Sequence, residues 1–207
     1  MREGFTVKQY KYKSYAEYVE CQKSANKKKS LNVWAVEENI KAIAEYIGSA
    51  NFGICHGTRG GYEQAWFKKY IPGCTVWGTE IGDASAPDTI QWDFNKPHPD
   101  LDRNVDFIYS NSFDHAFNPA ETLQVWANQV SSGGFIILEY DQRQEHTGEV
   151  SKSVNKTDPT SITVDELVEI VPKWIDGEVV DILDMPVVKI GFQKAVVIKI
   201  NHKVKGE

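Results

Sequence analysis

A short apolar run that breaks into a glycine-rich turn constrains the fold of this chain more than any other stretch. Residues 52–55 read Phe-Gly-Ile-Cys and predict a buried strand. The turn, Gly-Thr-Arg-Gly-Gly at residues 57–61, is followed by a helical pattern over residues 62–70. A strand, a glycine turn and a helix in this order open a nucleotide-binding βαβ unit. Glycine allows a sharp turn and the close approach of a ligand, and the free N–H groups of the next helix can face its polar or anionic groups.

The spacing of the glycines excludes two common nucleotide-binding loops. A dinucleotide-binding loop requires Gly-x-Gly-x-x-Gly, but Arg59 and Tyr62 occupy the second and third glycine positions when the count starts at Gly57. A phosphate-binding loop requires a glycine five positions after the first, and Tyr62 stands there as well. A glycine turn by itself is also compatible with a simple connection between a strand and a helix. The choice of ligand therefore depends on the residues downstream.

Composition narrows the class of protein. The chain has 207 residues, the length of one domain, with 41% hydrophobic and 25% charged residues as in soluble globular proteins. Its net charge of −6 argues against a nucleic-acid partner, because phosphates attract basic surfaces. No apolar run reaches the ~20 residues of a membrane span, and the N-terminus lacks a signal peptide's apolar stretch. Cys21, Cys55 and Cys74 form no Cys-x-x-Cys pair, which predicts reduced thiols, a cytoplasmic location and no metal site.

The remaining chain alternates between helical and strand patterns. Apolar residues recur at helical spacing in three stretches with a cap or a stop signal. The first predicted helix covers residues 36–48. The second begins at Pro119, has Val130 on its buried face and stops at Ser132-Gly133-Gly134. The third begins at a capping box of Thr163 and Glu166 and ends at Pro172. Further strands are expected at residues 75–79, 88–94, 105–109, 135–139, 179–183 and 194–200, the last two as an antiparallel pair.

Two segments do not follow this alternation. Residues 1–35 are polar and basic with interleaved tyrosines, and Tyr15, Tyr18 and Val19 suggest one face of a helix. We expect an N-terminal helical cap there, with a plain surface helix as the alternative. Residues 141–163 contain little apolar patterning, and a connection of this length is usually a functional loop or disordered. We interpret it as a substrate cap on a main domain that covers residues 36–207.

Polar residues stand where the predicted strands end. Glu80 ends the second strand, 23 positions after Gly57, and a carboxylate there can accept two hydrogen bonds from the hydroxyls of a ribose. Asp93 and Phe94 end the next strand, and residues 110–115 follow the fourth. Open α/β sheets bind ligands beyond the carboxyl ends of their strands. A surface carboxylate at Glu80 and a turn residue at Asp93 are the simpler alternatives.

In this order and spacing, the glycine loop, Glu80, Asp93 and residues 110–115 resemble the class I S-adenosylmethionine (SAM)-dependent methyltransferases, over roughly residues 36–200. Gly57 and Gly61 match the outer glycines of that family's Gly-x-Gly-x-Gly loop, and Arg59 departs from the middle one. The resemblance implies an α/β, Rossmann-like methyltransferase sandwich. Its sheet would be mostly parallel and seven-stranded, with an antiparallel last strand and helices on both faces.

The resemblance also implies a cofactor and the residues that bind it. With SAM as cofactor, Glu80 would bind the ribose, Asp93 would accept from the adenine amino group, and Phe94 would pack on the adenine ring. The segment after the fourth strand would meet the methionine part of SAM. The cofactor-binding residues implied are Gly57, Thr58, Arg59, Gly61, Glu80, Ile81, Asp93, Phe94, Ser110, Asn111 and Ser112.

The implied chemistry is an in-line transfer of the methyl group from the sulfonium to a nucleophile, and much of the work is positioning. An oxygen nucleophile also needs a group that takes its proton. His115 is the first candidate base, because imidazole titrates near pH ~6.5, and Asp114 and His146 come next. A histidine satisfied in the core is an equal alternative for His115, and an anionic or amine acceptor would need no base.

The acceptor is narrowed by what the sequence lacks. A DNA amino-methylase carries an Asn/Asp-Pro-Pro-aromatic signature after the fourth strand, where residues 111–114 read Asn-Ser-Phe-Asp. Protein and RNA methylases usually bring extra domains or a basic surface. A small molecule, such as a sugar or another metabolite, is left as the expected acceptor. A non-catalytic protein that binds SAM or a nucleotide in the same pocket is the alternative, and a nucleotide-dependent oxidoreductase is disfavoured by the glycine spacing.

Overall fold

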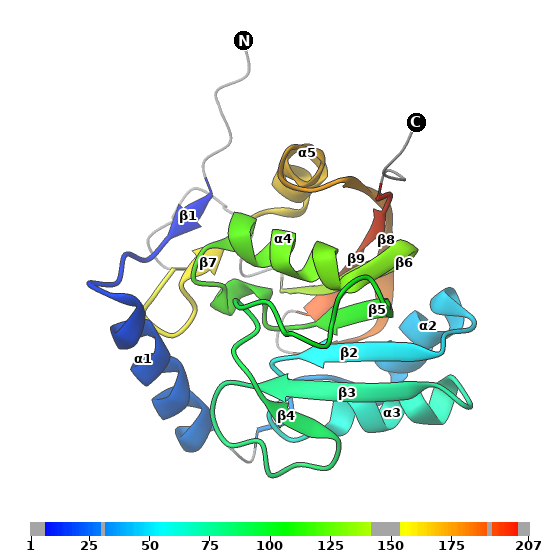
Figure 1. Ribbon diagram of the computed structural model, residues 1–207, viewed down its shortest axis with the longest axis horizontal. Coiled ribbons are helices and arrows are strands. Elements are labelled where there is room, and N and C mark those ends of the chain that lie inside the picture. Colours follow the sequence, from blue (N-terminus) through cyan, green and yellow to red (C-terminus); the bar gives the residue numbers. More distant parts are fainter. Residues whose placement is uncertain (1–6, 30–31, 142–153, 190–191, 203–207) are drawn as a thin grey trace.

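The computed structural model describes residues 7–29, 32–141, 154–189 and 192–202, which are built around one mixed sheet (Figure 1). His146 lies outside these residues. The strands of the sheet are β2 (Phe52–His56), β3 (Thr75–Glu80), β4 (Thr89–Gln91), β5 (Val105–Ser110), β6 (Val130–Asp141), β8 (Gly177–Lys189) and β9 (Phe192–Ile200). Within the described part of the chain these seven strands are arranged in the order β4-β3-β2-β5-β6-β9-β8.

The direction of the strands follows from their connections. Strands β2 to β6 are parallel to one another, whereas β9 is antiparallel to both β6 and β8. Parallel neighbours require a crossover connection, whereas antiparallel neighbours do not. The prediction of a mostly parallel seven-stranded sheet with an antiparallel last strand is confirmed.

Helices cover both faces of the sheet, as predicted (Figure 1). On one face α2 (Glu37–Ile47) and α3 (Tyr62–Tyr70) pack on side chains such as Cys55 and Phe107. On the other face α4 (Pro119–Gln129) and α5 (Val164–Trp174) pack on Ile54 and Ile108. Consecutive residues of a strand point to opposite faces, so each central strand contributes to both apolar cores.

Several predicted boundaries are wrong: α5 continues past Pro172 to Trp174, β4 is shorter than residues 88–94, and β8 is longer than residues 179–183. The largest error concerns α4. The sequence places the end of α4 at Ser132-Gly133-Gly134 and Val130 on its buried face, but α4 ends at Gln129 and Val130 begins β6. Val130 is fully buried because it pairs with Val105 at the start of β5. The pairing of β5 with β6 shifts register between Val105 and Phe107, so the glycines lie in an irregular part of a strand and not in a helix stop.

The N-terminal segment lies beyond the carboxyl ends of β2 and β3 (Figure 1). It contains β1 (Lys8–Gln9) and α1 (Tyr15–Lys28), and Ser14 caps the helix through a hydrogen bond from the Glu17 backbone N–H. The buried face of α1 consists of Tyr18, Gln22, Ala25 and Asn26. Strand β1 pairs antiparallel with β7 (Thr160–Ser161), so the described end of the 141–163 segment is tied to the N-terminal segment.

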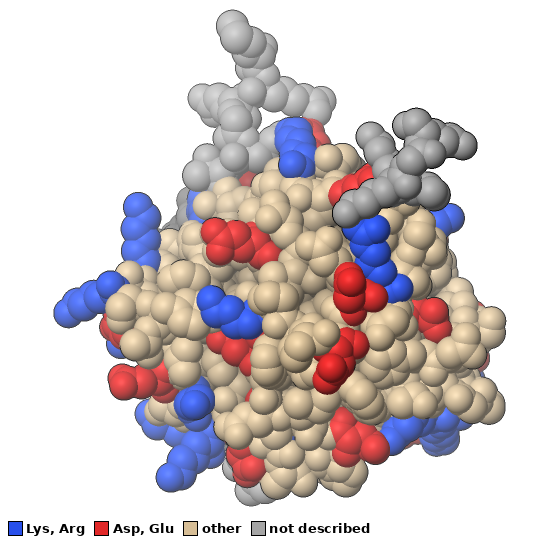
Figure 2. All heavy atoms as spheres, viewed as in Figure 1, with Lys and Arg blue, Asp and Glu red and all other residues tan. Residues whose placement is uncertain are grey.

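Charge is mixed over the face that Figure 2 shows: acidic side chains lie over its middle and basic ones mainly towards its edges. This face therefore offers no continuous basic surface of the kind that tracks a nucleic-acid backbone. None of the helices in the described ranges is both long and apolar enough to cross a membrane.

Gly53 shows how closely the central strands pack. It pairs with Phe107 across β2 and β5, and a Cβ at Gly53 would lie 2.2 Å from Cζ of the Phe107 ring. This ring cannot move aside easily, because it is fully buried and its centroid lies 4.9 Å from that of Phe67. Only glycine fits at this position.

We therefore expect Gly53→Ala to lower the free energy of unfolding by about 1–3 kcal/mol, the usual cost of overpacking a core. Denaturant unfolding measures the change. In a double-mutant cycle, Phe107→Leu should remove most of the cost of Gly53→Ala, because the smaller side chain makes room for the Cβ. Strictly additive losses in the double variant would show that the ring is not the cause.

Candidate functional site

The glycine loop is held to the neighbouring strand by its own backbone. The N–H groups of Gly57 and Thr58 both donate to the carbonyl oxygen of Thr79 on β3, at 2.9 and 3.2 Å. Gly57 and Gly61 have φ values of 77° and 74°, a region that disfavours side chains, so the two outer glycines are required by the backbone. Arg59 also has a positive φ, of 45°. The backbone of the loop is therefore strained at Arg59, the residue that carries a guanidinium group into the site.

Two cavities meet at this loop, beyond the carboxyl ends of the parallel strands. The larger has a volume of about 280 Å³, and the smaller, between the loop and α1, about 40 Å³. Arg59 and His115 line both cavities. The larger is also lined by Trp34, Thr58, Glu63, Asn111, Asp114 and Asp158, and the smaller by Gln22, Asn26, Glu80, Ile81, Asp93 and Phe94.

The structure thus brings most of the predicted cofactor residues together. Gly57 and Ser112 line both cavities, and a Cβ at Gly57 would lie 2.8 Å from Cβ of Ser112. Two predicted residues line neither cavity. Gly61 precedes the first residue of α3, and Ser110 is fully buried with its hydroxyl donating to the carbonyl oxygen of His56 at 2.9 Å.

The smaller cavity combines carboxylates with an aromatic ring. Glu80 is 6% exposed, and its Oε1 accepts a hydrogen bond from the N–H of Gly82 at 3.0 Å. The Phe94 ring packs edge-on against Trp126, with centroids 5.4 Å apart. Asp93 already has partners within the protein, because its carboxylate accepts from the Tyr15 hydroxyl and from the side chain of Asn95. Helix α1 therefore reaches the residues that the sequence assigns to adenine.

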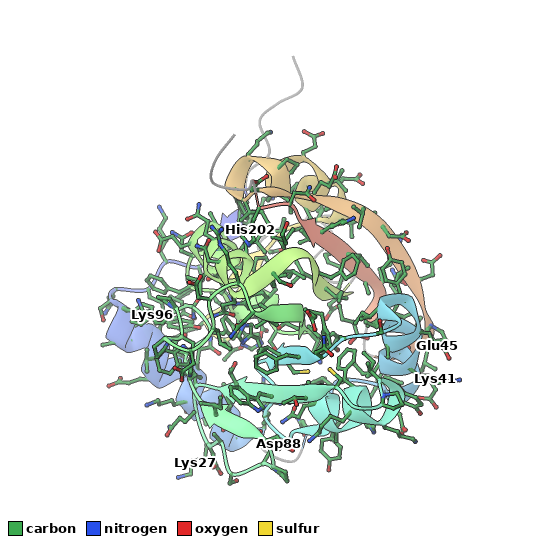
Figure 3. The ribbon with its side chains drawn as sticks, turned by 45° about the vertical axis from the view of Figure 1, so that its right-hand side comes forward. Lys27, Lys41, Glu45, Asp88, Lys96 and His202 are labelled. Atoms are coloured by element: carbon green, nitrogen blue, oxygen red, sulfur yellow. The ribbon has the colours of Figure 1, made fainter. Side chains whose placement is uncertain are left out.

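Lys96 helps to hold Tyr15 in place. Its ammonium group lies 4.1 Å from the centre of the Tyr15 ring, where a cation is attracted by the π-electrons. Figure 3 shows Lys96 beside α1. Burial raises the pKa of the Tyr15 hydroxyl, and the negative charge of Asp93 adds to this. Tyr15 therefore remains a hydrogen-bond donor to Asp93.

Arg59 is the most unusual group of the site. Its Nε and one terminal nitrogen are buried, and neither has a hydrogen-bond partner among the described residues. Burial lowers the pKa of the guanidinium, while Glu80 and Glu63 favour its charged form without contacting it closely. Buried donors that lack a partner are costly. A guanidinium in this position is suited to an anionic group placed between the two cavities.

Glu63, in the first turn of α3, is a buried carboxyl group that sequence reasoning missed. The hydroxyl oxygen of Thr58 lies 2.7 Å from Oε2 of Glu63 and 2.5 Å from Oε1 of Gln64. One hydroxyl hydrogen cannot serve both acceptors. Burial raises the pKa of Glu63 to about 7. A protonated Glu63 resolves the conflict, because it can donate to Thr58 while Thr58 donates to Gln64.

The two predicted catalytic residues lie in a short 3₁₀ turn, η1 (Phe113–His115), after β5. His115 Nε2 lies 3.7 Å from Oδ1 of Asp114 and 3.6 Å from Oδ1 of Asp158. Burial raises the pKa of Asp114 to about 6, and the nearby His115 opposes this shift. The ligating atoms of the three residues lie within 4.8 Å of one another, so the group could also hold a metal ion.

Asp158 was not predicted as a site residue, because it lies in the 141–163 segment, whose sequence has no periodic pattern. A turn built on Asn155 places it: the Asn155 side-chain oxygen accepts from the N–H groups of Thr157 and Asp158, at 2.8 and 3.1 Å. Asn-x-x-Asp was the available signal, since Asn favours such turns. What the turn would face could not be inferred.

No known protein-family profile matches the chain. No curated protein matches its sequence either.

Solved structures are similar to the chain in fold. One is the Burkholderia thailandensis 1,6-didemethyltoxoflavin-N1-methyltransferase with bound 1,6-didemethyltoxoflavin and S-adenosylhomocysteine, at TM-score 0.68 and 14% identity, with 93% of each chain covered. Another belongs to the complex of the Haloferax volcanii Trm112 methyltransferase activator with a methyltransferase, at TM-score 0.63 and 16% identity, covering 90% of this chain and 98% of that one.

A third is geranyl diphosphate C-methyltransferase from Streptomyces coelicolor A3(2), in complex with Mg²⁺, geranyl diphosphate and S-adenosylhomocysteine. It has a TM-score of 0.59 and 13% identity, covering 78% of this chain and 80% of that one. The protein has the class I methyltransferase fold that these structures share, as its sequence predicts.

The raised pKa of Glu63 predicts a pH-dependent stability. An unfolded Glu63 loses its proton near pH 4.5, whereas the folded protein keeps it to about pH 7. The folded state thus binds more protons between these values, so the contribution of Glu63 to stability is present below pH 4.5 and is lost as the pH rises to 7. In Glu63→Gln this loss is missing.

Between pH 4.5 and pH 8 we therefore expect the free energy of unfolding of Glu63→Gln to gain about 3 kcal/mol relative to that of wild type. Denaturant melts at a series of pH values measure the difference. Glu38→Gln, at an exposed position of α2, is the matched control and should follow wild type. A constant difference for Glu63→Gln across this range would contradict a protonated Glu63.

Proposed function

We propose that the protein is a SAM-dependent methyltransferase that acts on a small-molecule acceptor. The observation that carries the proposal is the grouping of Glu80, Asp93, Phe94 and the glycine loop around one cavity, at the strand ends of the class I methyltransferase fold. Two of the structures similar in fold contain S-adenosylhomocysteine. The glycine loop after β2 would lie nearest the methionine part of the cofactor. Glu80 at the end of β3 would lie at the ribose, and Asp93 and Phe94, which follow β4, would lie at the adenine.

The adenosine end of SAM requires a movement of α1. A cavity of about 40 Å³ holds little more than a water molecule or two, so the last turn of α1 with Asn26 has to withdraw before a nucleoside enters, while Gln22 keeps its bond to His115. Glu80 would then accept from the ribose hydroxyls, and the Phe94 ring would lie against the base. Asp93 has spare acceptor capacity for the adenine amino group in addition to its bond from Tyr15. We propose residues 1–35 as a cap over this end of the site.

The methionine end of SAM suits the two charged groups beside the larger cavity. Its carboxylate would satisfy the buried donors of Arg59, which have no partner among the described residues. Its ammonium group would lie near Glu63, whose carboxyl becomes an anion when a cation approaches. Thr58, Asn111 and Ser112 line the same cavity and would complete the contact.

SAM supplies an electrophilic methyl group, and the residues of this chain hold the acceptor in line with it and take its proton. His115 is the proposed base, with Asp114 and Asp158 beside Nε2 to stabilise the imidazolium. A cavity of about 280 Å³ with polar walls supports a small acceptor such as a sugar or another metabolite. The described end of the 141–163 segment, which carries Asp158, supports its proposed role as a substrate cap. The free Cys21, Cys55 and Cys74 support a cytoplasmic location.

Calorimetric titration with SAM, S-adenosylhomocysteine and NAD tests the proposal. The first two should bind and NAD should not. Glu80→Ala should weaken the binding of S-adenosylhomocysteine by about 1.5–3 kcal/mol, the range for hydrogen bonds to a charged group, while the exposed control Glu38→Ala should bind as wild type does. Failure of both adenosyl ligands to bind would contradict the proposed function, and binding without methyl transfer to any acceptor would favour a non-catalytic protein. An unchanged affinity in Glu80→Ala would contradict only the ribose contact.

A variant of Arg59 tests the proposed contact with the amino-acid end of the cofactor. We expect Arg59→Ala to weaken the binding of S-adenosylhomocysteine by about 1.5–3 kcal/mol. Its effect on 5′-methylthioadenosine should be small, because that ligand lacks the amino-acid end. Arg59→Lys, which keeps the charge but not the fork of donors, should be intermediate. Equal losses for both ligands would show that Arg59 contacts the adenosine part or only supports the loop.

A further inference from the structure

A chain of hydrogen bonds from α1 determines which nitrogen of His115 carries its hydrogen. Gln22 is 5% exposed, and its amide nitrogen donates to the carbonyl oxygen of Thr157 at 3.0 Å. A carbonyl oxygen only accepts, so the amide oxygen of Gln22 must face the other way, where it lies 2.9 Å from Nδ1 of His115. An oxygen there requires a donor. The hydrogen of a neutral His115 is therefore on Nδ1.

The other ring nitrogen, Nε2, is then left with a free lone pair. It lies between the carboxylates of Asp114 and Asp158, at 3.7 and 3.6 Å, and all three residues line the larger cavity. Two carboxylates give no hydrogen bond to a lone pair, but they attract a proton that arrives on it. The Tyr18 hydroxyl donates to the backbone carbonyl of His115 at 3.0 Å, so α1 holds both ends of the residue.

We propose that Gln22 is a positioning residue that fixes His115 in the Nδ1–H tautomer, so that Nε2 faces the larger cavity as a proton acceptor. The role of the proton transfer rests on the proposed function, whereas the tautomer does not. The proton would leave the nucleophilic atom of the acceptor as that atom bonds to the methyl group, while the bond between the methyl group and the sulfonium sulfur breaks and neutral S-adenosylhomocysteine is left. It comes to Nε2, where Asp114 and Asp158 stabilise the imidazolium.

This arrangement couples the position of α1 to the proposed proton transfer to His115. Gln22 lines the smaller cavity as well as holding His115. It also connects α1 to the Asn155 turn, next to Lys156, whose carbonyl oxygen accepts from the thiol of Cys21 at 3.2 Å. When α1 is docked, the base has the correct tautomer and both carboxylates beside it. When α1 moves away, His115 loses the partner of Nδ1.

The tautomer can be measured without cofactor or acceptor, by nitrogen-15 NMR of protein labelled at its histidines. The signals of His115 are assigned by their loss in His115→Asn. In wild type, neutral His115 should show a protonated Nδ1 and an unprotonated Nε2. In Gln22→Ala the Nε2–H form, which an unconstrained histidine side chain favours, should become the major one. Gln22→Glu loses the bond to Thr157 but keeps an acceptor for Nδ1–H, so neutral His115 should keep the wild-type tautomer. The matched control Lys23→Ala, on the exposed face of α1, should keep it as well.

A wild-type His115 with its hydrogen on Nε2, or a tautomer unchanged in Gln22→Ala, would overturn the proposal. A saturable shift of the His115 Nε2 signal by diamagnetic Zn²⁺ at the concentration of the protein would also overturn it, because Nε2 would then be a metal ligand. Each result is independent of the proposed function, which fails separately if S-adenosylhomocysteine does not bind. With an acceptor in hand, Gln22→Ala should lower kcat by at least about tenfold with little change in KM, and Gln22→Glu should restore most of it.

Discussion

Two backbone hydrogen bonds to the carbonyl oxygen of Thr79 fix the glycine loop, and the rest of the site depends on them. They place the start of α3 directly above the end of β3. The hydroxyl of the same threonine contacts the ring of His56 at 2.8 Å, and burial lowers the pKa of that histidine to about 3. A neutral imidazole thus supports the loop from below. With the loop fixed, Arg59 and Glu63 can be held as charged or protonatable groups in a buried setting.

Helix α1 adds side chains to the site that the ends of the strands form. Helix α1 lines the smaller cavity at the strand ends, and hydrogen bonds from Tyr15, Tyr18 and Gln22 to Asp93, His115 and Thr157 hold it there. Net contributions of about 1 kcal/mol for each hydrogen bond suffice to dock a helix but allow it to leave. Apolar burial of Tyr18 adds to them. A cover of this kind fits the proposed function, in which the site has to admit a cofactor and then exclude water from the reaction.

Sequence reasoning worked where local patterns are enforced by the backbone or by burial. The positive φ angles of Gly57 and Gly61, the strand ends at Glu80 and Ser110, and the capping box of α5 all follow from short-range rules. It failed at Val130, because helical spacing of apolar residues predicted a longer helix, whereas Val130 pairs with Val105 as part of a strand. It also missed Glu63, Asp158 and Gln22, whose positions in the chain give no sign of what they face.

The sequence by itself determined the fold class and the positions of the loops, because strand–helix alternation and glycine geometry are properties of neighbouring residues. It also determined which residue types lie at the ends of the strands. Only the tertiary structure decided that Gln22 and Asp158, which are far from His115 in the chain, lie beside its imidazole ring. It likewise decided that the guanidinium of Arg59 is buried without a partner in the described part of the protein. Protonation and pairing of this kind depend on the distance and burial of groups from distant segments, and no local pattern encodes these.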